Sequence, residues 1–194
     1  MPLQTIKHSD VNSFITDRFQ KNGRLLKSYS RIEYIQLLIL LLLIVKVSNS
    51  CYHQEYSALF LLGVSIYFSF SILIIIHEII HYLGYIILGK RDAYFGKVKK
   101  AMIFYVTTHS SKLNGYQYLF ISMLPIVLIT LFCIIFPILY NDLQLYYFTI
   151  PVMLCNYSFS KGDFAFCDYV LEQGISSLIL WNKQETIYIQ KTEK

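Results

Sequence analysis

The sequence predicts an all-α integral membrane protein with about four transmembrane helices and a short β-hairpin-like loop on the cytoplasmic side. The first observation is composition, because 55% of the 194 residues are hydrophobic and only 15% are charged. An ordinary soluble domain carries about 25% charged residues, so this chain lacks the polar surface of a soluble monomer. The second observation is a series of charge-poor runs that are too long to be core helices of a 22.8 kDa globule.

Four apolar runs are expected to cross the bilayer. They cover residues 32–48, 57–90, 113–140 and 143–160. The first run is short for a span of about 20 residues, but Glu33 and Lys46 near its ends can extend toward the two interfaces. The third run contains Pro125 and Pro137, which membrane helices tolerate.

Basic residues are distributed asymmetrically along the chain. Residues 1–31 contain six Lys or Arg residues, and the loop at 90–112 contains six more, whereas the loops at 51–56 and 141–142 contain none. Because cytoplasmic loops are enriched in Lys and Arg, both termini and the loop at 90–112 are predicted to be cytoplasmic. The expected location is the cell membrane, with several passes. Residues 1–31 lack an apolar stretch, so we expect no cleavable signal peptide.

The predicted organisation has three parts. They are a basic cytoplasmic N-terminal segment at 1–31, a transmembrane domain at 32–180 and a cytoplasmic C-terminal tail at 181–194. Short strands are expected in the middle loop and near the C-terminus, where β-forming residues flank turn residues. The expected strands lie within 94–100, 101–108, 178–181 and 186–190, with turns at 114–115 and 182–185.

The residues that carry chemistry form the motif His77-Glu78-Ile79-Ile80-His81 in the second span. On a helix, positions i and i+4 project from one face, so both imidazoles can bind one metal ion. Glu78 lies on the flank of that face and can take a proton from a metal-bound water. Each ionisable residue in a span costs about 2.5–3.5 kcal/mol, which metal binding would offset. The alternative is a hydrogen-bonded polar cluster that lines a cavity or is hydrated near the interface.

A catalytic zinc site takes three protein ligands and leaves one position for water. We expect Asp163 to be the third ligand, because the fourth helix can bring it to the depth of His81 if the helix is tilted or unwound at Gly162. A solvated acid at a helix end is the alternative interpretation of Asp163. The other ligand candidates are Asp168, Cys155 and Cys167, whereas His53 and His109 are expected outside the site.

Asn156 precedes Asp163 by seven residues, or two helical turns, and is expected on the same helical face. Its amide can donate a hydrogen bond to a substrate carbonyl or to a developing oxyanion. A polar residue that joins neighbouring helices is the equal alternative.

An HExxH motif in a membrane helix, a proline-containing third helix and a late Asn156-to-Asp163 segment together resemble the zincin peptidase family of small four-helix membrane proteins. This family is distantly similar to the site-2 intramembrane metalloproteases. The resemblance implies zinc bound by His77, His81 and Asp163, with Glu78 as the catalytic base. The chain lacks a Leu-Asp-Gly motif, since Gly162 precedes Asp163, and no Asn-Pro pair is present.

The sequence therefore predicts a membrane zinc metalloprotease of the HExxH type, with Zn²⁺ as cofactor and Glu78 and Asn156 as catalytic residues. The expected partners are a peptide or membrane-protein substrate and the lipid bilayer, with no nucleic acid. The residues do not indicate an oligomeric state. The alternative is a membrane transporter or immunity-type protein that uses the buried His and Glu for ion or proton handling without hydrolysis. A catalytically inactive relative that acts as a scaffold is a third interpretation.

Overall fold

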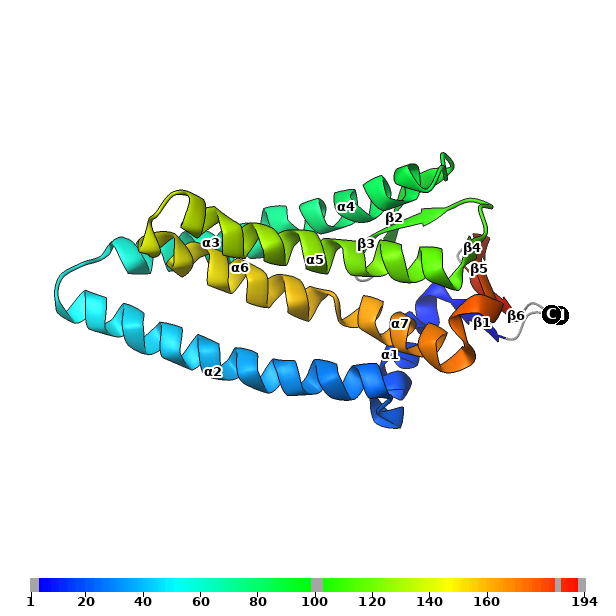
Figure 1. Ribbon diagram of the computed structural model, residues 1–194, viewed down its shortest axis with the longest axis horizontal. Coiled ribbons are helices and arrows are strands. Elements are labelled where there is room, and N and C mark those ends of the chain that lie inside the picture. The colour runs from blue at the N-terminus through cyan, green and yellow to red at the C-terminus, as the bar shows by residue number, and fades with distance from the viewer. Residues whose placement is uncertain (1–3, 99–102, 184–185, 192–194) are drawn as a thin grey trace. The chain divides into compact units, whose positions relative to one another are not determined.

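The computed structural model describes residues 4–98, 103–183 and 186–191, and most of these residues are helical (Figure 1). The helices are α1 (Val11–Lys21), α2 (Arg24–Tyr52), α3 (Ser57–Phe68), α4 (Ile74–Ile87), α5 (Gly115–Leu139), α6 (Tyr146–Phe159) and α7 (Lys161–Gln173). The strands are β1 (Gln4–Lys7), β2 (Ala93–Val98), β3 (Ile103–Thr108), β4 (Leu113–Asn114), β5 (Leu178–Lys183) and β6 (Thr186–Lys191). Short turns of 3-10 helix are η1 (His8–Asp10), η3 (Leu143–Leu145) and η4 (Ile175–Ser177), and a π-helical turn, η2 (Ser69–Leu73), joins α3 to α4.

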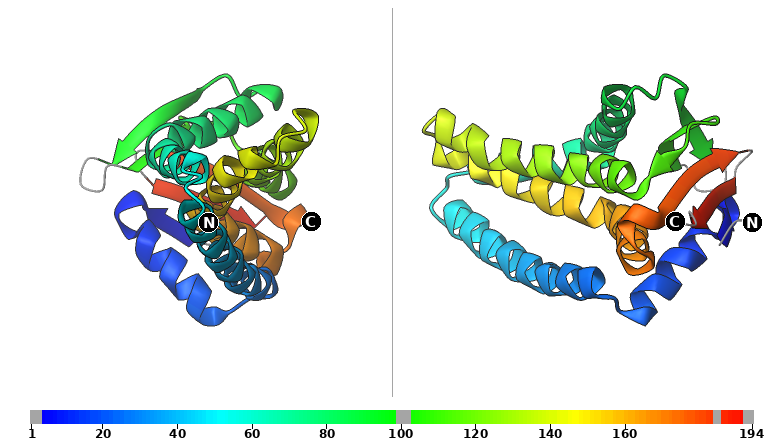
Figure 2. Two further views of the ribbon diagram at one scale, coloured as in Figure 1. Left: turned by 90° about the vertical axis from the view of Figure 1, so that its left-hand side faces the viewer. Right: turned by 45° about the vertical axis from the view of Figure 1, so that its right-hand side comes forward.

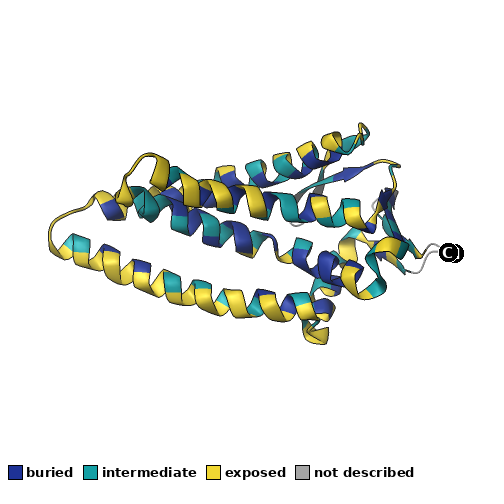
Figure 3. Ribbon diagram, viewed as in Figure 1, coloured by how far each residue is buried: buried dark blue, intermediate teal, exposed yellow. Residues whose placement is uncertain are grey.

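Three helical segments of the described chain are long and apolar enough to cross a membrane. They are Arg24–Tyr52, Ser57–Ile87 and Gly115–Leu139, which agree with the first three predicted spans. Much of the α2 surface is exposed along its length (Figure 3). The fourth predicted run is also helical, as η3 and α6, but α6 has only 14 residues and a span needs about 20. A fourth crossing therefore stays a prediction.

The chain divides into two compact units, each of which is described by itself. The first contains Met1–Lys27, Glu78–Pro125 and Lys161–Lys194. Its antiparallel sheet has the order β1-β6-β5-β4, so the N-terminal strand pairs with a C-terminal one, as the blue and red ribbons in Figure 2 show. Helices α1 and α7 pack together beside this sheet. The core between them contains Ile6, Phe14, Phe166, Tyr169, Val170, Leu178, Leu180 and Ile189.

This sheet corrects the prediction of an all-α fold. The strands predicted at 178–181 and 186–190 are confirmed, but β5 continues to Lys183 and so takes up the first half of the expected turn, while residues 184 and 185 lie outside the described part. The N-terminal segment at 1–31 supplies β1, α1 and the start of α2. No strand was expected there, because four residues are too few for a clear alternating pattern.

The predicted hairpin in the middle loop is confirmed as β2 and β3, which pair in the register Ala93↔Thr108; residues 99–102 lie outside the described part. The turn expected at Asn114-Gly115 is instead the start of α5. Asn114 Oδ1 accepts from the Gln117 backbone N–H at 2.9 Å, and Gln117 Oε1 accepts from the Asn114 backbone N–H at 3.1 Å. These reciprocal bonds form a capping box that begins the helix.

The second unit contains Ser28–His77 and Ile126–Ser160. Helices α3 and α6 pack along each other in it (Figure 1). Helix α2 is joined to α6 by Tyr29 and Tyr157, whose rings stack with centroids 4.6 Å apart. Each tyrosine hydroxyl also donates to the backbone carbonyl of the other tyrosine, at 3.4 and 3.2 Å.

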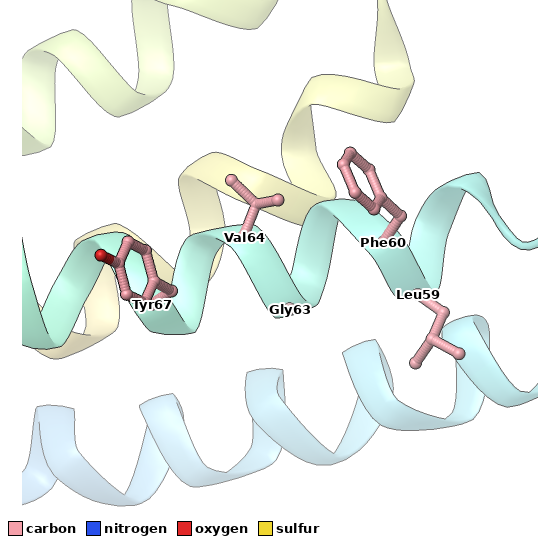
Figure 4. Close-up of a pocket in the computed structure, with 5 residues that line it drawn as sticks. All are labelled: Leu59, Phe60, Gly63, Val64 and Tyr67. Atoms are coloured by element: carbon pink, nitrogen blue, oxygen red, sulfur yellow. The ribbon is translucent and has the colours of Figure 1, made fainter.

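A shallow hollow lies along α3 in the second unit (Figure 4). It is lined by Leu59, Phe60, Gly63, Val64 and Tyr67. This lining contains no His, Cys, Asp or Glu side chain, so it offers none of the ligands that commonly bind zinc.

Candidate metal centre

Helix α4 carries the HExxH motif and brings its three polar side chains together. Ligand atoms of His77, Glu78 and His81 all lie within 4.8 Å of one another. His77 is 5% exposed and His81 is 8% exposed, while Glu78 is half-buried. The separation of four residues places both imidazoles on one face of the helix, as the sequence predicts. The three groups can therefore serve a single ion.

Each imidazole uses its Nδ1 atom in a hydrogen bond. Nδ1 of His77 lies 3.0 Å from the amide oxygen of Asn156, and Nδ1 of His81 lies 3.0 Å from the backbone carbonyl oxygen of Ile121. Both partners are oxygens that only accept, so each Nδ1 carries the proton. In a neutral imidazole the lone pair is then on Nε2, which is the arrangement that metal-binding histidines adopt.

Asp163 adjoins the second histidine of the motif. Its Oδ1 lies 3.5 Å from Nε2 of His81, and its side chain is 19% exposed. The expected location at the end of the fourth helix is corrected, because α6 ends at Phe159 and Asp163 lies in the first turn of α7. An acidic side chain in a first turn interacts favourably with the helix dipole.

The competing ligand candidate Asp168 is used elsewhere. Its Oδ2 accepts a hydrogen bond from the buried guanidinium of Arg18, and its Oδ1 accepts from the Leu25 backbone N–H at 3.1 Å. Burial lowers the pKa of Arg18, but its bonds to Asp168 and Glu172 outweigh this and raise the pKa overall. Asp168 therefore compensates a buried cation at the start of α2.

The cysteines and the remaining histidines do not join the motif in the described part of the chain. Cys167 is fully buried, and this burial is the main cause that raises the pKa of its thiol, whereas a metal ligand must be a thiolate. Cys155 is half-buried in α6. His53 meets the ring of Tyr52 edge to face, with centroids 5.4 Å apart, and His109 stacks against Tyr94 with ring centroids 4.0 Å apart.

A family model described as "Putative zincin peptidase" matches residues 70–177. The chain belongs to this family. The matched segment includes the HExxH motif of α4 and also Asp163. A search of curated proteins and a search of solved structures each found no significant match.

The side chains at the motif are suitable ligands for zinc, the metal for which zincin peptidases are named. Two neutral imidazoles and nearby carboxylates are ligands that Zn²⁺ accepts. The partners of the two Nδ1 atoms meet the further requirement that ligating histidines be held by a second hydrogen bond. The residues present therefore fit a zinc ion at the zincin peptidase motif.

Two hydrogen bonds of the site were not predicted from the sequence. The first is the contact of Asn156 with His77. An amide within an apolar stretch indicates a specific polar partner, but it does not identify that partner. The Ile121 carbonyl could not have been predicted, because a backbone acceptor leaves no trace in the sequence. The predicted catalytic role of Asn156 toward substrate stays a prediction.

Proposed function

We propose that this zincin peptidase family member is a membrane-embedded zinc metallopeptidase that hydrolyses a peptide bond of a membrane-associated substrate. The observation that carries the proposal is the pair of motif imidazoles, each with its Nδ1 proton donated to an oxygen acceptor. The setting adds support, because the motif lies in Ser57–Ile87, a segment apolar enough to cross a membrane. Ionisable groups in such a segment are usually functional.

In the proposed centre, His77 and His81 bind zinc through Nε2, and Asp163 is the third protein ligand. The position of Asp163 Oδ1 at 3.5 Å from His81 Nε2 favours it over the other candidates. Asp168 is disfavoured because its removal from Arg18 would leave a buried charge without compensation. Bound zinc would polarise the scissile carbonyl and make water acidic enough to deprotonate near neutral pH.

Glu78 is the proposed general base. Its carboxylate takes one proton from the attacking water, whose oxygen forms the new bond to the carbonyl carbon. The same carboxyl group then returns that proton to the amide nitrogen as the C–N bond breaks, so the products are a carboxylic acid, which keeps the second proton of the water until it ionises in solution, and an amine. The half-buried environment of Glu78 keeps it close to both histidines while leaving it accessible to water.

The substrate is proposed to bind as an extended strand along β2. The His109 backbone N–H donates to the Asp92 carbonyl at 3.3 Å, which makes this pair a hydrogen-bonded one. Pairs alternate along an antiparallel ladder, so the backbone groups of Ala93 and Phe95 point away from β3. In the described residues β2 pairs with β3 alone. The Phe95 ring also stacks on Tyr82, the residue after His81, with centroids 5.2 Å apart.

Strand addition would present the substrate in the conformation that hydrolysis requires. Main-chain hydrogen bonds to an open strand edge are sequence-tolerant and hold a peptide extended. A helical substrate must first unwind, because its carbonyl groups are hydrogen-bonded internally.

Zinc stoichiometry tests the proposal. The full chain is purified in detergent, and bound metal is measured for wild type, His77→Ala, Asp163→Ala and, as a matched control, the exposed His109→Ala. We expect one zinc per wild-type and His109→Ala chain and a strong reduction in the other two variants. Zinc content unaffected by His77→Ala would refute the metal centre. Unchanged content in Asp163→Ala alone would move the third-ligand role to another group.

The formation of a cleaved product distinguishes the peptidase from the transporter or immunity-type interpretation. Purified wild type that binds zinc and releases a cleaved product from a membrane-protein substrate supports the peptidase. Zinc binding together with metal or proton flux into vesicles, and no cleaved product, would support a carrier instead.

A further inference from the structure

Asn156 has a fully buried amide side chain in a mainly apolar part of α6. It is 0% exposed, in a helix whose other buried residues are mainly apolar. A buried amide that lacks hydrogen-bond partners costs about 1–3 kcal/mol. Its oxygen accepts the Nδ1 proton of His77 at 3.0 Å, so the amide acts on a group of the proposed metal centre.

We propose that Asn156 is a positioning residue whose amide oxygen sets the orientation and the tautomer of His77. This inference rests on the proposed zinc centre. With the proton held on Nδ1, Nε2 carries the lone pair that a metal requires. A hydrogen bond to Nδ1 also restrains rotation of the ring, so less conformational freedom is lost when metal binds.

The neighbours of Asn156 hold it rigidly enough for this role. Its backbone carbonyl accepts from the Ser160 backbone N–H at 3.1 Å and from the Ser160 hydroxyl at 2.9 Å. The next residue, Tyr157, is buried and exchanges hydrogen bonds with Tyr29 of α2. The helix is therefore held at Asn156 and at the residue that follows it. A positioning group needs this kind of support, because it can orient a ligand no better than it is itself oriented.

Three variants of the full chain in detergent test the role. Asn156→Asp keeps an oxygen acceptor at the same reach, whereas Asn156→Leu has similar size and no acceptor. Ser158→Ala is the matched control, because Ser158 is an exposed residue of the same helix. Zinc affinity is measured by competition with a chromophoric chelator, and the absorption spectrum of the Co²⁺-substituted protein reports ligand geometry. The unfolding midpoint of each metal-free protein is measured in parallel.

We expect Asn156→Leu to weaken zinc binding by about 10- to 100-fold, the usual effect of losing an outer partner of a ligating histidine. Asn156→Asp should stay close to wild type, with a shifted Co²⁺ spectrum, and Ser158→Ala should leave both readouts unchanged. If Asn156→Leu fails to fold, Asn156→Ser, whose hydroxyl is too short to reach His77, should show the same loss.

Two results would overturn the assignment. Wild-type zinc affinity in Asn156→Leu would show that the amide does not act on His77. Equal weakening in Asn156→Asp and Asn156→Leu would show that an acceptor oxygen is not what matters. Failure of the zinc centre itself is distinguishable, because wild type would then bind no zinc or His77→Ala would bind it normally.

Discussion

The buried guanidinium of Arg18 is bonded to the carboxylate of Asp168, two residues that lie 150 positions apart in the chain. Arg18 is 3% exposed and Asp168 is 4% exposed. The same carboxylate accepts the Leu25 backbone N–H and so caps the start of α2. A Cβ atom added to Gly23 would lie 2.2 Å from Asp168 Oδ2, so this approach requires glycine. Within the first unit, Asp168 thus joins α1 and α7 to the first turn of α2.

Asp168→Asn is expected to destabilise the protein without removing zinc. Breaking a buried ion pair costs about 3–5 kcal/mol, and the lower end applies because Glu172 still binds Arg18. Chemical denaturation of the full chain measures the loss, and metal analysis accompanies it. Asp163→Asn is the matched variant, with the opposite result expected: reduced zinc and a smaller change in stability. Loss of zinc from Asp168→Asn at unchanged stability would instead make Asp168 the zinc ligand and contradict its structural role.

The helical part of the fold was predictable because its signals are local. Long apolar runs indicate helices without reference to any other segment, and the bounds of α5 differ from the prediction by two residues at the start and one at the end. The grouping of His77, Glu78 and His81 was equally predictable, since helix geometry alone places positions i and i+4 together.

The four-stranded sheet was not predictable in the same way. Gln4 pairs with Ile189, and nothing in either short segment encodes this partner. The Arg18–Asp168 pair has the same property, so Asp168 could not be separated from Asp163 as a ligand on sequence grounds. Both cases are long-range contacts, whose energy comes from burial that a local pattern does not contain.

Glu78→Gln is expected to keep zinc and lose turnover. The amide retains the size of the carboxylate but cannot take a proton from water, so kcat should fall by about 10²- to 10⁴-fold. Steady-state hydrolysis of a membrane-protein substrate measures this, and Glu55→Gln, at an exposed position outside the motif, is the control. Unchanged kcat in Glu78→Gln would exclude Glu78 as the base.

Substitutions at the open edge of β2 are expected to weaken substrate binding and to leave the rate of the chemical step unchanged. Phe95→Pro removes a backbone N–H that points away from β3, which should raise KM by about 3- to 10-fold, the equivalent of one hydrogen bond. Phe95→Ala is the matched control, because it removes the ring that stacks on Tyr82 but keeps the N–H. Equal KM values for the two variants would rule out strand addition at this position.

Asp92 is expected to make the end of the hairpin sensitive to acid. Burial raises the pKa of its carboxyl group, but hydrogen bonds from the Ser111 hydroxyl and the Ser110 and Ser111 backbone N–H groups outweigh this and lower the pKa to about 2, from an ordinary value of 3.8. The backbone N–H groups donate to Asp92 Oδ2 at 2.9 Å.

Because the pKa is lower in the folded state, these bonds contribute full stability above pH 3.8, and the contribution is lost as pH falls toward about 2. Hydrogen exchange of the Ser110 and Ser111 amides should therefore show protection that declines across this window after correction for the intrinsic pH dependence of exchange. Asp92→Asn should have weaker protection at neutral pH and no decline between these values. A wild-type profile that is flat from pH 4 to about 2, or one that Asp92→Asn reproduces, would show that the carboxylate does not hold this turn.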